Sequence, residues 1–198
     1  MPLHGRPQPP SNIVPTTNPC APSPACHVER VSKFGESPLY DGRQSVTALA
    51  VARGSQRLLT SLGRSCVCEL PLPSGRRADL VALADDGEIW IVEVKSSVAD
   101  FRADQKWQDY RMHCDRLLFA TAADVPRHIF PDDAGLIVAD EFGADLVREP
   151  PEHRLHAATR KTMLLLIARA AAHRLQKLAD PHGLTRPNCD DAPCALLR

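Results

Sequence analysis

Two charged residues, Glu93 and Lys95, end the otherwise apolar segment Ile89-Trp90-Ile91-Val92-Glu93-Val94-Lys95. Side chains alternate between the two faces of a strand, so Glu93 and Lys95 are predicted to share one face. A segment this apolar on both faces is typical of the buried centre of a sheet. A charge there is costly unless it is paired or binds a metal. A neighbouring strand must therefore supply a partner.

Asp79 is the predicted partner, because it lies on the preceding strand candidate, residues 77–84. The intervening Asp85-Asp86-Gly87 is typical of a hairpin turn. If all three residues form the loop, Asp79 lies directly opposite Glu93 on the same face. A two-residue loop would slip the register by one residue and turn Asp79 to the other face.

Glu69 is predicted to extend this pair into a row of three acids. It lies on the strand candidate 66–72, and a three-residue loop at Pro73-Ser74-Gly75 sets it opposite Asp79. Opposed like charges destabilise a sheet. Two carboxylates about 4 Å apart repel by roughly 4 kcal/mol at an effective dielectric constant near 20. A divalent cation would remove this repulsion.

The chemistry of these side chains favours a hard metal ion and hydrolysis. Oxygen ligands without a nearby histidine favour Mg²⁺, with Mn²⁺ as a substitute. Asp79 and Glu93 would form the primary site, while Glu69 would reach the ion through water or hold a second one. Lys95 would orient and help deprotonate the attacking water and offset negative charge in the transition state. Together these groups suit phosphodiester hydrolysis.

At these residues the sequence resembles the PD-(D/E)XK nuclease superfamily, with Asp79 as the first acid and Glu93-Val94-Lys95 as the second acid, spacer and lysine. Ala78 stands where proline is usual. The resemblance implies catalytic roles for Glu69, Asp79, Glu93 and Lys95, and a metal ligand at the backbone carbonyl of Val94.

More narrowly, residues 43 to 178 resemble the bacterial MmcB-type DNA repair proteins. The motifs that carry this likeness are Ser74-Gly75-Arg76-Arg77-Ala78-Asp79, Val92-Glu93-Val94-Lys95-Ser96-Ser97, Asp100-Phe101-Arg102, Lys106-Trp107 to Tyr110, and Cys114-Asp115. The likeness implies an α/β fold with a restriction-endonuclease-like αβββαβ core, in which helices flank a mixed sheet and a further helix follows. It also implies Mg²⁺-dependent nuclease chemistry and a role in DNA damage repair.

The segment after Lys95 is predicted to contact nucleic acid. Many superfamily members carry Gln-x-x-x-Tyr on a helix here; this chain has Lys106 and Tyr110, which would share one face of a helix running from an Asp100 N-cap to near Met112. Phosphates would be held, without reading of sequence, by Arg76, Arg77, Arg102, Lys106 and Tyr110. The alternatives are a solvated helix face for the cations and a core position for Tyr110.

The remaining elements follow from hydrophobic periodicity and composition. Helices are predicted over 45–62 and 155–179, the second covering the sheet with the stripe Leu164, Ile167, Ala171, Leu175 and Leu178. Strands are predicted over 116–121, 135–139 and 144–147. A single domain over 41–180 would lie between a proline-rich disordered tail, 1–40, and a second disordered tail, 181–198.

Composition also indicates the cellular location of the protein, the redox state of its cysteines and its charge. No apolar run reaches the roughly 18 residues of a membrane span, and no signal peptide is evident, so a cytoplasmic protein is expected. The seven cysteines, among them Cys20, Cys26, Cys189 and Cys194 in the tails, are expected to be reduced thiols. The formal net charge of zero does not favour nucleic-acid binding, so the case depends on local cations.

The sequence therefore predicts a Mg²⁺-dependent DNA endonuclease that acts in DNA repair. Only the family resemblance favours DNA over RNA. A non-catalytic nucleic-acid-binding module of the same fold and a restriction-like or RNA-processing nuclease are the alternatives. No membrane partner is expected, protein partners are not specified, and a homodimer stays open.

Overall fold

The computed structural model describes residues 44–104 and 106–181. The predicted disordered tail 1–40, the second tail from residue 182 onward, and the four cysteines assigned to these tails lie outside the described residues. Three cysteines lie within them, Cys66, Cys68 and Cys114, and all three are free thiols. No helix in this part of the chain combines the length and apolarity needed to cross a membrane.

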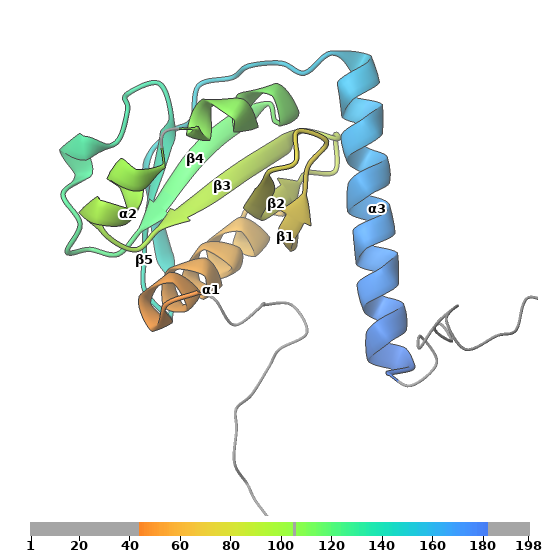
Figure 1. Cartoon of the computed structure of the whole chain (residues 1–198), viewed down its shortest axis with the longest axis horizontal. Coiled ribbons are helices and arrows are strands. Elements are labelled where there is room, and N and C mark those ends of the chain that lie inside the picture. The colour runs from red at the N-terminus through yellow and green to blue at the C-terminus, as the bar shows by residue number, and fades with distance from the viewer. Residues whose placement is uncertain (1–43, 105, 182–198) are drawn as a thin grey trace, which may run out of the picture. The chain divides into compact units, whose positions relative to one another are not determined.

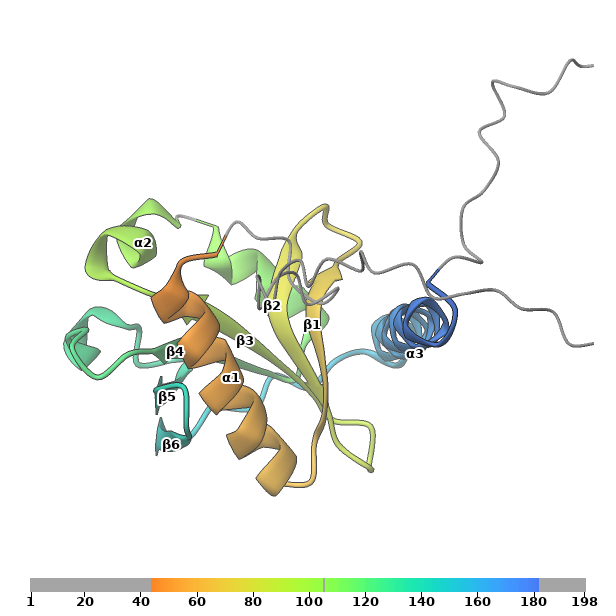
Figure 2. The ribbon, with the colours of Figure 1, turned by 90° about the horizontal axis from the view of Figure 1, so that it is seen from below.

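A six-stranded mixed sheet forms the centre of the domain, with its strands in sequence order (Figures 1 and 2). The strands are β1 (Ser65–Pro71), β2 (Arg77–Leu83), β3 (Ile89–Lys95), β4 (Arg116–Thr121), β5 (Gly135–Ala139) and β6 (Ala144–Arg148). The first three form an antiparallel meander, β3, β4 and β5 are parallel, and β6 is antiparallel to β5. With α1 (Val46–Ser61) before the meander, this arrangement confirms the predicted αβββαβ core and mixed sheet.

Both hairpins of the meander close through three-residue loops, as predicted. The Ala84 N–H donates to the Glu88 carbonyl at 3.0 Å, and the Leu72 N–H donates to the Arg76 carbonyl at 2.8 Å. The last loop residue is Gly75 or Gly87, each with a positive φ that glycine adopts without steric cost. These loops set the register that pairs Leu80 with Val92 on the next strand.

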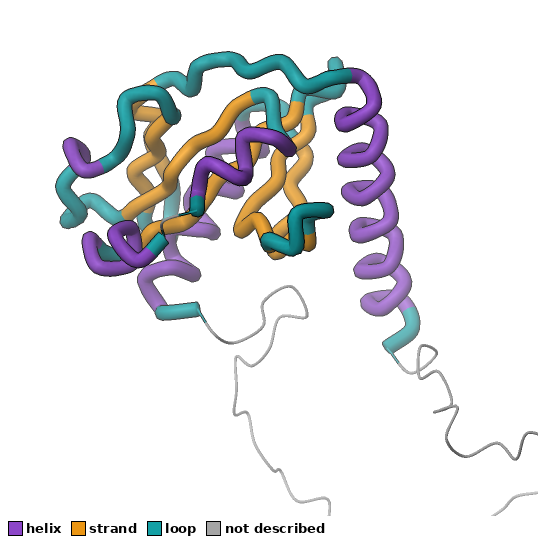
Figure 3. Tube along the Cα trace, turned by 45° about the horizontal axis from the view of Figure 1, so that its top comes forward, coloured by secondary structure: helices purple, strands orange, loops and turns teal. Residues whose placement is uncertain are grey.

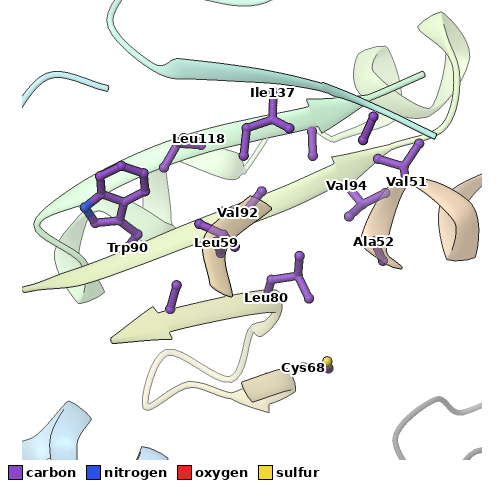
Figure 4. Close-up of a cluster of buried hydrophobic side chains, with 13 residues drawn as sticks. Val51, Ala52, Leu59, Cys68, Leu80, Trp90, Val92, Val94, Leu118 and Ile137 are labelled. Atoms are coloured by element: carbon purple, nitrogen blue, oxygen red, sulfur yellow. The ribbon is translucent and has the colours of Figure 1, made fainter. Parts of the chain in front are cut away.

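Helix α1 covers one face of the sheet, where its buried side chains meet those of strands β1 to β5. Val51, Ala52 and Leu59 pack against Leu80 and Val92 in the cluster drawn in Figure 4. The helix begins at Ser45, whose hydroxyl accepts a hydrogen bond from the Ala48 N–H. Gly54 lies so close to the β5–β6 turn that a Cβ there would be 2.2 Å from the Asp140 carbonyl oxygen.

The opposite face of the sheet carries α2 (Val98–Ala103), the 3₁₀ helix η1 (Trp107–His113) and the beginning of α3 (Ala157–Ala179). Figure 3 shows α1 and η1 on opposite sides of the strands. A second short 3₁₀ helix, Arg127–Ile129, joins β4 to β5. The predicted continuous helix from Asp100 to Met112 is wrong, because the chain leaves helical geometry between α2 and η1. The N-cap of α2 is Ser97, whose hydroxyl accepts from the Asp100 N–H.

Helix α3 covers less of the sheet than its hydrophobic stripe predicted. Met163 and Ile167 are buried, but Leu175 and Leu178 are 68% and 56% exposed. The helix packs against β1 and η1, and β1 is the edge strand of the sheet. The C-terminal half of α3 therefore has no strand beyond β1 to cover.

A buried ion pair fastens the start of α3 to the sheet. Asp115 is 2% exposed, and both of its carboxylate oxygens accept hydrogen bonds from Arg160, at 2.6 and 2.8 Å. The backbone N–H groups of Ile89 and Leu155 complete its partners. Burial would raise the pKa of the Asp115 carboxyl, but these hydrogen bonds outweigh burial and hold the pKa below its ordinary value. Arg160 thus ties α3 to the end of the sheet where β3 begins.

Candidate functional site

Asp79, Glu93 and Lys95 lie at the C-terminal end of β3, around a cavity of about 520 Å³. Asp79 comes from β2, while Glu93 and Lys95 come from β3. Gln44, just before α1, and Tyr110, from the 3₁₀ helix η1, also line the cavity. Most of the accessible lining is polar, which distinguishes this cavity from the core around it.

Asp79 and Glu93 face each other across the β2–β3 pair, and each accepts a hydrogen bond from the backbone of the opposite strand. The Asp79 N–H donates to Glu93 Oε1 at 3.3 Å, and the Val94 N–H donates to Asp79 Oδ2 at 2.8 Å. The loop of the β2–β3 hairpin brings them together, because the register that it sets continues along the strands to Leu80 and Val92, next to Asp79 and Glu93. Each carboxylate keeps an oxygen that makes no hydrogen bond to these backbone groups.

Both carboxyl groups are harder to ionise than in water. Burial, and after it the neighbouring Asp79 carboxylate, raises the pKa of Glu93 well above its ordinary value. Burial also raises the pKa of Asp79, although the Val94 N–H and the Lys95 charge oppose that shift. A second negative charge in this cavity is therefore unfavourable, and a bound cation would relieve it.

Lys95 is held by an acid that the sequence reasoning missed. Its Nζ donates to Asp104 Oδ2 at 2.7 Å and lies 3.9 Å from Glu93 Oε2. Burial alone would lower the pKa of the ammonium group, but the Asp104 hydrogen bond and the Glu93 charge more than offset burial, so the pKa lies above its ordinary value. A charged amine can orient water and stabilise an anion, but it cannot accept a proton from that water.

Glu69 does not join the pair at the cavity, in contrast to the expected row of three acids. Its φ is 47°, in the left-handed region, and this breaks the alternation of β1, so that Val67 and Leu70 pack into the same cluster. The Glu69 carboxylate pairs with the Arg77 guanidinium at 2.5 Å and accepts a hydrogen bond from the Gln44 amide. The ion pair with Arg77 therefore holds the Glu69 carboxylate away from Asp79 and Glu93.

The predicted phosphate-binding residues divide into two groups. Arg76, Arg77 and Tyr110 line the cavity, whereas Arg102 and Lys106 do not. Lys106 precedes η1 with non-helical backbone angles and is exposed, while Tyr110 is buried, so the predicted shared helix face does not exist.

The cavity-lining cations and Tyr110 also make contacts of their own. Arg76 donates two hydrogen bonds to Asp109, at 3.0 and 3.2 Å. The Tyr110 hydroxyl donates to the Arg77 carbonyl at 3.2 Å. Burial, followed by the charges of Glu93 and Asp79, raises the pKa of this phenol, which therefore remains a hydrogen-bond donor.

Gln44, Asp100 and Asp104 are among the residues at the cavity that were not identified as site residues from the sequence. Asp100 accepts hydrogen bonds from the backbone and hydroxyl of Ser96. The spacing Ser97-x-x-Asp100 is that of a capping box, and this signal could have located the start of α2. No sequence signal marks Asp104, because its approach to Lys95 depends on where α2 ends.

The donor groups at the cavity fit a magnesium ion better than a softer metal. Asp79, Glu93 and the backbone carbonyl of Val94 offer only oxygen, and Mg²⁺ is typically held by one or two carboxylates together with water and substrate phosphates. Within residues 44–104 and 106–181, no group of three or more histidine, cysteine or acidic side chains is arranged to hold a metal. An ion in this cavity would be held by the Asp79–Glu93 pair.

The fold and this cavity define an α/β domain with paired acids and a lysine at one end of its sheet. The model of the MmcB-like family, described as DNA repair protein MmcB-like, matches residues 35–182. The chain belongs to this family, as its motifs predicted.

A solved structure supports the same assignment of the fold. A protein of unknown function from Silicibacter pomeroyi is 41% identical to this chain, with a TM-score of 0.68. The similarity covers 72% of this chain and 99% of that one. No curated protein matches the chain.

Proposed function

We propose that this protein is a Mg²⁺-dependent endonuclease of the PD-(D/E)XK type that hydrolyses phosphodiester bonds of DNA during repair in the cytoplasm. The pairing of Asp79 with Glu93 beside Lys95 is the observation that carries this proposal. Buried carboxylates with raised pKa values in a polar cavity are unfavourable for folding and are characteristic of functional sites.

In this proposal Asp79 and Glu93, with the Val94 carbonyl, hold the ion. When bound, Mg²⁺ would supply polarisation of a phosphoryl oxygen and activation of water. The Lys95 ammonium would orient the attacking water and stabilise the additional negative charge that develops on the phosphate. Because Lys95 is charged, the proton of the water must go to another acceptor, such as a phosphate oxygen of the substrate. Glu69 would act only through the Arg77 and Gln44 side chains that it contacts.

The arginines that line the cavity would position the substrate. Arg76 and Arg77 contact acids of the domain and could exchange part of those contacts for phosphate oxygens. DNA is preferred over RNA because the family to which the chain belongs is described as a DNA repair family. Arg102 and Lys106, outside the cavity, would contact phosphates further from the cleaved bond.

A non-catalytic nucleic-acid-binding module is the second candidate. It is favoured by the Glu69–Arg77 pair, which leaves two acids rather than three to hold an ion. Such a module would bind nucleic acid through the same cations without hydrolysing it.

A cleavage assay separates the two candidates. Supercoiled plasmid and a panel of single-stranded, duplex, branched and RNA oligonucleotides would be incubated with Mg²⁺, Mn²⁺ or EDTA. The nuclease proposal requires cleavage that depends on the metal and is lost in Asp79→Asn protein purified in parallel. Binding without cleavage by the wild-type protein under every metal condition would refute the nuclease and support the binding module.

A further inference from the structure

Helix α3 concentrates positive charge in a chain whose formal net charge is zero. No aspartate or glutamate occurs between Glu152 and Asp180, a stretch that contains the whole helix. The five cations of α3 are Arg160, Lys161, Arg169, Arg174 and Lys177. A formal charge of +5 on one helix creates a local field that the balanced composition of the whole chain conceals.

These cations divide between the packed side and the open side of the helix. Arg160 and Arg174 are partly buried and donate hydrogen bonds to the domain, Arg160 to Asp115 and Arg174 to the Glu69 carbonyl. Lys161, Arg169 and Lys177 are exposed. Arg160 and Arg174 therefore fix α3 in position, and the three exposed cations remain available to an anionic partner.

A chain of contacts links α3 to the cavity, and the length of the helix is close to one turn of duplex DNA. The helix lies beside β1 (Figures 1 and 2), where Arg174 contacts the Glu69 carbonyl and the Glu69 carboxylate pairs with Arg77. Arg77 in turn lines the cavity of Asp79 and Glu93. With 23 residues, α3 is about 34 Å long, close to one turn of duplex DNA, about 34 to 36 Å.

We infer that α3 is a binding surface for the phosphate backbone of duplex DNA, which it holds without reading sequence while the duplex reaches the cavity. The inference rests on the proposed function, in which the duplex enters the cavity to be cleaved. Phosphates attract lysine and arginine regardless of base sequence.

The exposed leucines of α3 do not form the surface that a membrane would require. Leu165, Leu175 and Leu178 are exposed, but they spread over about 140° around the helix axis at 3.6 residues per turn, and Lys161 falls within that arc. A helix that lies on a membrane needs a continuous apolar face. On α3 that face is instead packed against the domain through Met163 and Ile167.

The test is duplex binding by the full chain in EDTA, so that binding is measured without cleavage. The variant is Lys161→Gln with Arg169→Gln. Its matched control is Arg53→Gln with Arg127→Gln, which removes the same charge from exposed positions outside α3. If each α3 cation contacts one phosphate, the dependence of log affinity on log salt should become shallower by about 2, and affinity at about 0.1 M salt should fall roughly 60-fold. The control should retain the wild-type slope.

Three results would count against the inference, and they are distinguishable. If the wild type binds duplex DNA and the α3 variant keeps its affinity and salt slope, α3 is not the binding surface, while the proposed function stands. If the wild type binds no duplex at any salt concentration, both fail. If the α3 variant loses binding to vesicles of phosphatidylserine and phosphatidylcholine but keeps duplex binding, α3 is a membrane-surface helix.

Discussion

The burial of Glu93 predicts that its charge lowers the stability of the metal-free protein. The side chain is 2% exposed and faces Asp79, and its pKa is raised by burial and by that neighbour. In the unfolded chain the pKa of a glutamate is about 4.3. As the pH rises from that value through the higher folded value, the folded protein holds the extra proton, and stability falls. At a pH above both the unfolded and the folded pKa of Glu93, the free energy of unfolding remains lowered.

Replacement of Glu93 by glutamine should therefore stabilise the metal-free protein near pH 8. Two carboxylates about 4 to 5 Å apart repel by roughly 3 to 4 kcal/mol at an effective dielectric constant near 20. Lys95, 3.9 Å from Glu93 Oε2, offsets part of this repulsion. A net gain of about 2 kcal/mol would remain, equivalent to an increase in Tm of roughly 6 °C for a domain of this size.

Thermal unfolding in EDTA between pH 5 and pH 9 would measure this gain, with Glu141→Gln, at an exposed position, as the control. Mg²⁺ at about ten times its Kd should stabilise the wild type by about 1.4 kcal/mol and the Glu93→Gln protein by much less. The reasoning is refuted if Glu93→Gln has the same Tm and pH profile as the wild type, or if Mg²⁺ stabilises both proteins equally.

Four further predictions follow from the site and the core. Lys95→Met should reduce cleavage at least 100-fold in a plasmid nicking assay, with duplex affinity in EDTA changed only a few-fold. Asp104→Asn removes the hydrogen bond that raises the pKa of Lys95, so the alkaline limb of the cleavage pH profile should move to lower pH, and Asp104→Glu should restore it. Gly54→Ala would force a Cβ against a backbone carbonyl, and the urea midpoint should fall by the equivalent of about 2 kcal/mol or more. Arg160→Met leaves the Asp115 carboxylate buried without its cation and should cost about 3 kcal/mol in urea unfolding at pH 7. Because the pKa of Asp115 is lowered, its contribution to wild-type stability is present above the unfolded pKa and is lost as the pH falls through the folded pKa.

The Asp79–Glu93 pair could be predicted because two local rules agree. The loop of the β2–β3 hairpin has turn chemistry and a length that fixes the register, and the alternation of the strands then fixes which side chains share a face. Both rules act over short separations in the chain, so the sequence alone contains the information. The same holds for α1, whose start and end are marked by Ser45 and Gly63.

Glu69 departs from its predicted place because a tertiary contact overrides the alternation. The β1–β2 register is as predicted, with Cys68 paired to Leu80. However, the left-handed backbone at Glu69 and its ion pair with Arg77 turn the carboxylate away from the other acids. A glycine at this position would have predicted a left-handed backbone, whereas a glutamate does not.

The segment after Lys95 and the length of α3 show a second limit of sequence patterns. Periodicity indicates that residues can form a helix, but it does not report a break between α2 and η1, so Asp104 could not be placed beside Lys95. The leucines of α3 predicted a buried stripe, yet the sheet ends at β1 and leaves Leu175 in solvent. How far a neighbouring layer extends is a property of the assembled fold.

The three-residue turns of the meander restrict how this protein can diverge. The residues within each turn are exposed or partly exposed and can be exchanged freely, provided that Gly75 and Gly87 keep their backbone geometry. The length of the turn after β2 is fixed more strictly than its composition. Inserting or deleting one residue there would move Asp79 to the helix α1 side of the sheet. Homologues that keep this chemistry should therefore vary the composition of that turn but change its length only in steps of two.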